Sequence, residues 1–177
     1  MISTKINAGT FKGRVLSLPP QTITRAVSSK VRSSIFNKLD VDGANVLDLF
    51  AGGGTLGFEA LSSGASYATF VDKSDKAIAV IKQNARSLGV IDKVKIKKSD
   101  VERFCDNLGL KYDIVFLDPP YRLFSNTLVK TTSNLLQLGG ILVISCSSKS
   151  SVELAPGLEL IAEKNYGDTK IVYFQKT

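Results

Sequence analysis

Residues 113–121 of this chain read Asp-Ile-Val-Phe-Leu-Asp-Pro-Pro-Tyr. The apolar run 113–117 predicts a strand that is buried on both faces, as in a parallel sheet. The two prolines lack backbone donors and fix φ near about −65°, so we expect the strand to end at Asp118. Ligands of open α/β sheets bind at the carboxyl ends of the strands. This stretch therefore predicts both the class of the fold and the edge of the sheet that holds the site.

The groups in this loop suit a planar exocyclic amine. Asp118 and the carbonyl of Pro119 can each accept a hydrogen bond from an –NH2 group, and Tyr121 can stack on a heterocycle, a contact worth about 1–3 kcal/mol. Acceptors that hold the amine hydrogens out of the ring plane localise the nitrogen lone pair and favour its attack on an activated methyl group. We therefore predict that Asp118, Pro119, Pro120 and Tyr121 are catalytic. The alternative is a proline-rich turn that only closes a strand.

A glycine-rich turn follows an earlier predicted strand, residues 45–50. Its glycines Gly52, Gly54 and Gly57 have the spacing G-x-G-x-x-G, which lets a ligand approach the backbone at a helix N-terminus. Asp72 ends the next predicted strand, where a carboxylate can bind ribose hydroxyls. These features fit a dinucleotide, so an NAD-dependent oxidoreductase is an open alternative. A glycine-rich turn without any ligand is another.

Two further acids favour S-adenosylmethionine over NAD as the cofactor. Asp48 precedes the glycines at the end of its strand, where it would repel a pyrophosphate but suits a ligand with an ammonium and a sulfonium group. Asp100 follows a third predicted strand and could accept a hydrogen bond from an adenine amino group; alternatively, it caps the helix after it. The predicted cofactor-binding residues are Asp48, Phe50, Gly52, Gly54, Asp72, Lys73, Asp100 and Val101.

Strand and helix patterns alternate along most of the chain. The expected strands are residues 45–50, 67–72, 93–98, 112–117 and 141–146, and the expected helices are residues 54–63, 74–88, 100–108 and 126–138. This alternation predicts an α/β fold with a parallel sheet. Residues 158–166 and 170–175 have instead the pattern of an antiparallel hairpin around Gly167-Asp168.

The first forty residues predict a separate small unit. Residues 3–18 have the pattern of a hairpin, and residues 28–39 have that of an amphipathic helix with a serine as its N-cap. We therefore divide the chain into a basic extension, residues 1–40, packed on a catalytic domain, residues 41–177.

The positive charge of the chain is unevenly placed. The net charge is +7, yet residues 1–38 hold seven basic side chains and no acid, so the remainder is neutral. A basic extension on a neutral body is typical of proteins that bind a nucleic acid. A solvated surface that only aids solubility is the alternative. The predicted RNA-binding residues are Lys12, Arg14, Arg25, Lys30 and Arg32.

The composition excludes several classes of protein. No apolar run approaches the roughly 20 residues of a membrane span, and the start of the chain lacks the pattern of a signal peptide. The chain has no histidine, and its two cysteines, Cys105 and Cys146, have no framework spacing. We therefore expect reduced thiols in a cytoplasmic protein, no metal site, and neither a histidine base nor a Ser-His-Asp triad.

The motifs taken together resemble those of a known family. The glycine turn followed later by D-P-P-Y resembles class I amino-methyltransferases, and further segments are similar to the RsmD family of small-subunit ribosomal RNA guanine-N2 methyltransferases. These segments are residues 6–14 (INAGTFKGR), 31–37 (VRSSIFN), 48–65 (DLFAGGGTLGFEALSSGA) and 166–169 (YGDT). The resemblance implies a Rossmann-like, seven-stranded, mostly parallel sheet with an antiparallel last strand, S-adenosylmethionine as the cofactor, and an RNA guanine as the acceptor.

The chain departs from the family pattern at three places. Ala26 and Val27 stand where the family has proline and threonine, Ser33 replaces an acid, and Ser145 to Ser148 stand at the end of the fifth predicted strand, where an acid is common. These departures concern contacts with RNA more than the cofactor site.

The resemblance implies methyl transfer from S-adenosylmethionine to the exocyclic N2 of a guanine in 16S ribosomal RNA. The expected partner is small-subunit ribosomal RNA or the small ribosomal subunit, and we expect a monomer. The target base must be unpaired or flipped out of its stack. Two alternatives stay open: another exocyclic amine, such as adenine N6 of DNA or RNA, and the NAD-dependent reaction.

Overall fold

A seven-stranded sheet is the centre of the fold. The structure, a computed structural model, describes residues 2–20, 27–106 and 109–177. The strands pair in the order β5-β4-β3-β6-β7-β9-β8. Their bounds are β3 (Asn45–Leu49), β4 (Tyr67–Asp72), β5 (Val94–Lys98), β6 (Tyr112–Leu117), β7 (Leu136–Ser147), β8 (Leu158–Tyr166) and β9 (Thr169–Lys176). Every pair of neighbouring strands within β3 to β7 is parallel. Strand β9 is antiparallel to both β7 and β8. The predicted fold class is confirmed.

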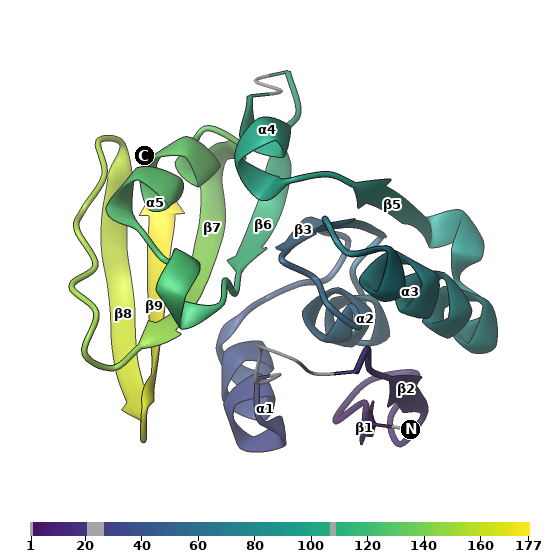
Figure 1. Ribbon diagram of the computed structural model, residues 1–177. Coiled ribbons are helices and arrows are strands. Elements are labelled where there is room, and N and C mark those ends of the chain that lie inside the picture. The colour runs from purple at the N-terminus through teal and green to yellow at the C-terminus, as the bar shows by residue number, and fades with distance from the viewer. Residues whose placement is uncertain (1, 21–26, 107–108) are drawn as a thin grey trace.

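Helices cover both faces of this sheet. They are α1 (Ser29–Lys38), α2 (Thr55–Ser62), α3 (Asp75–Leu88), α4 (Val101–Cys105) and α5 (Asn126–Ser133), with the short 3-10 helices η1 (Ile91–Lys93) and η2 (Tyr121–Leu123). Successive strand residues point to opposite faces. Val46 and Phe116 enter an apolar cluster with α1, α2 and α3, whereas Leu47 and Val115 enter another with α4 and α5. The fold therefore has three layers with the sheet in the middle (Figure 1).

Local signals in the sequence explain several helix boundaries. The Ser28 side chain accepts a hydrogen bond from the Val31 N–H at 3.3 Å, and the Ser74 side chain accepts one from the Ala77 N–H at 3.4 Å. These N-caps begin α1 and α3 as predicted. Gly89 ends α3 in the left-handed conformation, with φ of +73°. Within the described ranges, no helix has the length and apolar character needed to cross a bilayer.

The helix predicted over residues 126–138 is wrong in its second half. Helix α5 ends at Ser133, and β7 begins at Leu136 and continues to Ser147. Leu136 is buried and pairs with Tyr112 of β6. Burial and sheet pairing therefore outweigh the helical periodicity of this leucine-rich segment, because tertiary context overrides propensity.

The N-terminal extension shares the apolar core of the sheet. Strands β1 (Ser3–Lys5) and β2 (Val15–Ser17) form the predicted hairpin, with Ser3 opposite Ser17. Ile6, Leu16 and Ile35 are buried in the cluster that also contains residues of α2 and α3. The hairpin lies beside α3, and α1 lies beside α2 (Figure 1).

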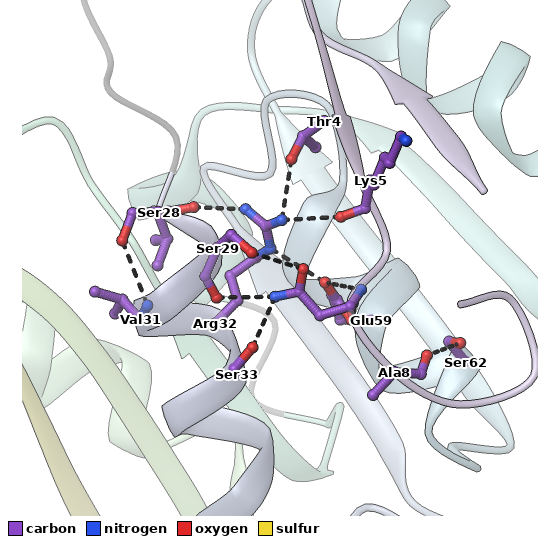
Figure 2. Close-up of polar contacts among 12 residues, drawn as sticks. Thr4, Lys5, Ala8, Ser28, Ser29, Val31, Arg32, Ser33, Glu59 and Ser62 are labelled. Atoms are coloured by element: carbon purple, nitrogen blue, oxygen red, sulfur yellow. Dashed lines mark hydrogen bonds and ion pairs between the residues drawn. The ribbon is translucent and has the colours of Figure 1, made fainter. Parts of the chain in front are cut away.

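A tight approach holds the hairpin on α2. Gly9 has φ of +76°, and a Cβ at this position would lie 1.8 Å from the carbonyl oxygen of Ser62. Thr10 donates its backbone N–H to the same oxygen at 2.8 Å. The Ser62 hydroxyl donates to the Ala8 carbonyl (Figure 2). Only glycine fits at this position, because any side chain would push the hairpin off the helix.

Candidate active site

The two predicted loops meet where the order of the strands reverses. The chain passes from β3 outward to β4 and β5, and then crosses to β6 on the other side of β3. Leu49 and Leu117 are register partners at the ends of β3 and β6. Phe50 and Asp118 therefore follow at the same edge of the sheet, at the switch point where ligands of doubly wound folds bind.

The glycine-rich turn leaves part of its backbone open. Phe50 has φ of +58°, a conformation that side chains rarely adopt, and Gly54 caps α2 in the same left-handed region. At Gly52 a Cβ would have no neighbour closer than the Phe50 carbonyl oxygen, at 4.0 Å. At Gly57 a Cβ would lie 2.3 Å from the ring of Phe70, so α2 packs closely on β4. The first glycine thus leaves space for a ligand, and the last serves packing.

Asp72 holds the glycine turn from the end of β4. Its Oδ2 accepts the Gly52 N–H at 2.9 Å, and its Oδ1 accepts the Ser74 N–H at 2.9 Å. Each carboxylate oxygen keeps a second lone pair. The half-buried Asp72 can therefore still accept hydrogen bonds from ribose hydroxyls.

Asp48 lies below the same turn, inside β3. It is 2% exposed, and its Oδ2 accepts the Gly57 N–H at 3.0 Å. Burial raises the pKa of the Asp48 carboxyl well above its ordinary value, the Gly57 N–H opposes this shift, and the negative charges of Asp118 and Asp72 add to it. Asp48 is therefore close enough to Asp72 and to Asp118 for each of their charges to act on it, as the positions of the three acids at neighbouring strands predict.

The other predicted cofactor residues lie at this edge in varied surroundings. Asp100 is exposed after β5, and its Oδ1 accepts the Glu102 N–H at 3.0 Å as the N-cap of α4. Asp100 therefore caps α4 through Oδ1, as the alternative interpretation of this residue predicts. Val101 is buried in the second apolar cluster, and Lys73 is exposed after β4.

The groups at this edge fit S-adenosylmethionine. The open backbone at Gly52 can receive the ligand, Asp72 can accept ribose hydroxyls, and the carboxylates near Asp48 suit a cationic ligand. A pyrophosphate would instead face several carboxylates, which disfavours the dinucleotide alternative.

The loop of Asp118, Pro119, Pro120 and Tyr121 forms one wall of a cavity of about 1200 Å³, which we call the acceptor cavity. The start of α1 and the turn between β8 and β9 form other walls, and Ser145 of β7 lies among them. Three segments far apart in the sequence therefore enclose one space at the carboxyl edge of the sheet.

Asp118 is half-buried at this cavity. Burial raises the pKa of its carboxyl to about 6, and a hydrogen bond from the Ser145 side chain opposes the rise. At neutral pH the carboxylate form therefore predominates and offers acceptor oxygens to a ligand. At pH values below about 6 the protonated form loses part of this capacity.

Tyr121 is held at its hydroxyl while its ring stays partly open. The hydroxyl is hydrogen-bonded to Oγ1 of Thr169 at 2.7 Å, and the residue is 46% exposed. Tyr166 lies across the turn from Thr169, at the end of β8, and its hydroxyl is hydrogen-bonded to the Ser34 hydroxyl of α1. The turn between β8 and β9 is thus fixed to both the D-P-P-Y loop and the N-terminal extension.

The predicted RNA-binding residues that the structure describes have different surroundings. Lys30 lines the acceptor cavity at the start of α1. Lys12 and Arg14 are exposed on the hairpin, where the Arg14 guanidinium donates to the Ser87 carbonyl at the end of α3. Arg25 lies outside the described residues.

The prediction that Arg32 binds RNA is wrong. This side chain is 2% exposed, and its Nε donates to Oε1 of Glu59 at 3.1 Å. Nη1 donates to the Val27 carbonyl at 2.7 Å, and Nη2 donates to the Thr4 hydroxyl and the Lys5 carbonyl, each at 3.0 Å (Figure 2). The helical periodicity of α1 places Arg32 on the polar side, but the hairpin covers that side and leaves no room for a phosphate.

The departures from the family pattern have structural partners. Val27 is buried at the wall of the acceptor cavity. The Ser33 hydroxyl accepts a hydrogen bond from Nδ2 of Asn7 at 3.1 Å, and Ser145 bonds to Asp118. Ala26 lies outside the described residues.

Several cavity residues were not identified from the sequence. They are Arg122, Ser145, Lys164, Tyr166 and Thr169. Arg122 follows the D-P-P-Y loop directly, which was a usable signal. Residues 166–169 of the tail hairpin match the family pattern but were not assigned to a site, because only the order of the strands brings β8 and β9 next to β7.

The chain matches known proteins along almost its whole length. The family model described as "Conserved hypothetical protein 95" matches residues 4–175. "Putative rRNA methyltransferase YlbH" of Bacillus subtilis is 32% identical over 181 residues, which covers 97% of this chain and 98% of that protein. "Ribosomal RNA small subunit methyltransferase D" of Escherichia coli strain K12 is 32% identical over 161 residues, which covers 89% of this chain and 78% of that protein. The solved structure "Putative methyltransferase yhhF from Escherichia coli" has a TM-score of 0.88 and 26% identity, with 98% of each chain covered.

Proposed function

This chain belongs to the RsmD family of S-adenosylmethionine-dependent ribosomal RNA methyltransferases, and from this premise we propose that it methylates the exocyclic N2 of a guanine in small-subunit (16S) ribosomal RNA. The names of its relatives support ribosomal RNA as the substrate. The position of Asp118 is the observation that supports an amine as the methyl acceptor. Its carboxylate lines the acceptor cavity and lies close enough to Asp48, below the glycine turn, for their charges to interact.

The D-P-P-Y loop would orient the amine. In its ionised form Asp118 accepts one hydrogen bond from the –NH2 group, and the Pro119 carbonyl accepts the other. These two acceptors turn the nitrogen lone pair out of the ring plane. Pro120 keeps the loop rigid, and the Tyr121 ring stacks on the base.

The edge beyond β3 and β4 would hold the cofactor. When bound, S-adenosylmethionine supplies an electrophilic methyl group on a positively charged sulfur. Asp72 would accept the ribose hydroxyls, Gly52 and Gly54 would contact the ligand through their backbone, and Asp100 would accept from the adenine amino group. The buried Asp48 would favour a cationic ligand below the glycine turn. Phe50, Lys73 and Val101 complete the proposed set.

Positioning of the two reactants would be the main source of catalysis at this site. The residues would align the amine with the methyl group and exclude other relative orientations, which lowers the entropic part of the activation barrier. The amine nitrogen loses its proton to water after it has been methylated, so the reaction needs no histidine base.

RNA would bind across the N-terminal extension and the acceptor cavity. Lys12, Arg14, Arg25 and Lys30 are the proposed phosphate contacts of the extension, residues 1–40, on the catalytic domain, residues 41–177. The guanine must be unpaired or flipped into the cavity, at a cost of a few kcal/mol. The partner would be small-subunit RNA or the small ribosomal subunit in the cytoplasm, and the enzyme would act as a monomer.

The test is a labelling experiment with small ribosomal subunits that lack their native methylation. Purified protein and methyl-labelled S-adenosylmethionine are added, the RNA is digested, and the labelled nucleoside is identified. Asp118→Ala is run in parallel, with Asp92→Ala as a control because Asp92 is an exposed acid in η1, remote in sequence from the D-P-P-Y loop.

The expected result is label in N2-methylguanosine, lost in Asp118→Ala and kept in Asp92→Ala. Label in N6-methyladenosine would overturn the guanine and leave methyl transfer to an amine. No label in any RNA would overturn the proposed reaction.

A further inference from the structure

Three cationic side chains from separate parts of the chain line the acceptor cavity. Lys30 comes from the first turn of α1, Arg122 follows the D-P-P-Y loop, and Lys164 comes from β8. The ion pairs of the described residues are those of Arg32, Lys98 and Lys170, so none of the three cations forms an ion pair with a carboxylate of this part of the chain. Convergent, unpaired cations at one cavity predict an anionic ligand.

Lys164 rests on a fixed aromatic ring. Its Nζ lies 5.2 Å from the centroid of the Tyr166 ring. Tyr166 packs against the core cluster of α1 and α2, and its hydroxyl is bonded to Ser34. The cation–π contact therefore holds the ammonium group at the cavity wall instead of leaving it free in solvent.

The size of the cavity exceeds the needs of a single base. Small-molecule sites usually enclose about 300–1000 Å³, whereas this cavity measures about 1200 Å³. The acids at its wall are Asp118, which the proposed function assigns to the amine, and the exposed Asp168 of the turn. The rim therefore carries more positive than negative charge, with room for the backbone on either side of the base.

We propose that Lys30, Arg122 and Lys164 bind the phosphates that flank the flipped nucleotide, so that the RNA strand crosses the cavity between α1 and the turn of β8 and β9. The proposal rests on the proposed function, since it takes the acceptor to be a nucleotide within a strand. The planar guanidinium of Arg122 can bind a phosphate through two parallel hydrogen bonds, and the two lysines act as point charges. Lys164 and Arg122 thereby become substrate-binding residues outside the basic N-terminal extension.

The first measurement is the salt dependence of RNA affinity. A short, labelled single-stranded RNA with one central guanine is titrated by fluorescence anisotropy at several KCl concentrations. Lys30→Met, Arg122→Met and Lys164→Met should each reduce the slope of log K against log salt by about 0.7, the value for one phosphate contact with a single strand. Lys111→Met is the control, because Lys111 directly precedes β6 and therefore lies at the opposite edge of the sheet from the cavity. Slopes equal to that of the control would overturn the proposal.

A second measurement locates the contacts on the RNA. The same RNA is made with uncharged methylphosphonate linkages on both sides of the guanine. Lys164→Met and Arg122→Met should weaken binding of the natural RNA and leave binding of the substituted RNA unchanged, because the partner charge is already gone. Equal weakening for both RNAs would show that these cations contact other phosphates, and would overturn the assignment to the flanking ones.

The two proposals fail in different measurements. Label in N2-methylguanosine together with unchanged salt slopes would overturn the assignment of the three cations to phosphates and leave the proposed function intact. Reduced slopes together with no label in any RNA would overturn the proposed function and leave the three cations as part of an RNA-binding site.

Discussion

The guanidinium of Arg32 and the carboxylate of Glu59 form a buried ion pair, with 3.1 Å between Nε and Oε1, that joins α1 to α2 (Figure 2). Both oxygens of Glu59 also accept the Asn7 N–H, at 3.0 and 3.1 Å. The pair therefore connects the N-terminal hairpin, the helix that lines the acceptor cavity and the helix that follows the glycine turn.

Removal of Glu59 is expected to destabilise the whole protein. Glu59→Ala leaves the Arg32 charge buried without a partner, which typically costs about 3–5 kcal/mol in the free energy of unfolding. Lys98→Met is the control, because it breaks an exposed pair with Asp75 that is worth about 1 kcal/mol or less. Urea denaturation measures both. Equal small losses for the two variants would contradict a structural role of the buried pair.

The pH profile of methyl transfer is expected to have an acidic limb near pH 6. The pKa of Asp118 is raised to about 6, so kcat/KM should fall as the pH drops through this value and the carboxylate becomes protonated. The Ser145 hydrogen bond lowers this pKa, and Ser145→Ala should move the limb to higher pH. Ser145→Thr keeps a hydroxyl and should leave the limb near its original position. A limb that does not move in Ser145→Ala would contradict this role of Ser145.

The hydrogen bond between Tyr121 and Thr169 is expected to position the ring that stacks on the base. Tyr121→Phe and Thr169→Val should each lower kcat/KM, and the double variant should lose no more than either single one. A coupling of about 0.5–1.5 kcal/mol is expected for one such bond. Thr169→Ser is the control and should resemble the wild type. Additive losses in the double variant would show that the two residues act independently.

Alanine substitutions at two glycines of the hairpin are expected to differ sharply in their effect on stability. Gly9 and Gly13 both have positive φ, so alanine at either costs about 1–2 kcal/mol of backbone strain. At Gly13 a Cβ would meet nothing within 4 Å, whereas at Gly9 it would meet the Ser62 carbonyl. Gly9→Ala should therefore cost about 1–3 kcal/mol more than Gly13→Ala in urea denaturation. It should also expose the hairpin to limited proteolysis. Equal stability of the two variants would contradict the tight contact with α2.

The regular part of the fold was readable from the sequence because its signals are local. Apolar runs, serine N-caps and Gly89 each act within a few residues, and they place β3 to β6 and α1 to α3 closely. The end of α5 was missed because the burial of Leu136 depends on β6, which is distant in sequence.

The site was only partly readable for the same reason. Asp48, Asp72 and Asp118 could be placed because parallel strands end at one edge. Arg32 was misjudged because a helical wheel describes one helix and not the hairpin packed on it. Glu59, the one charged residue of α2, was the available signal, since an acid in a helix whose residues are all buried requires a partner.

The acceptor cavity takes its walls from the start of α1, from the D-P-P-Y loop and from the turn of β8 and β9, whereas the glycine turn belongs to β3 and α2. Gly167 and Asp168 at the tip of the turn between β8 and β9 are exposed, so these two positions can be substituted without disturbing the core. In evolutionary terms, acceptor preference can diverge through this short turn while the cofactor is retained. Descendants of one ancestor could thus acquire different target nucleotides through changes in the tail of the chain alone.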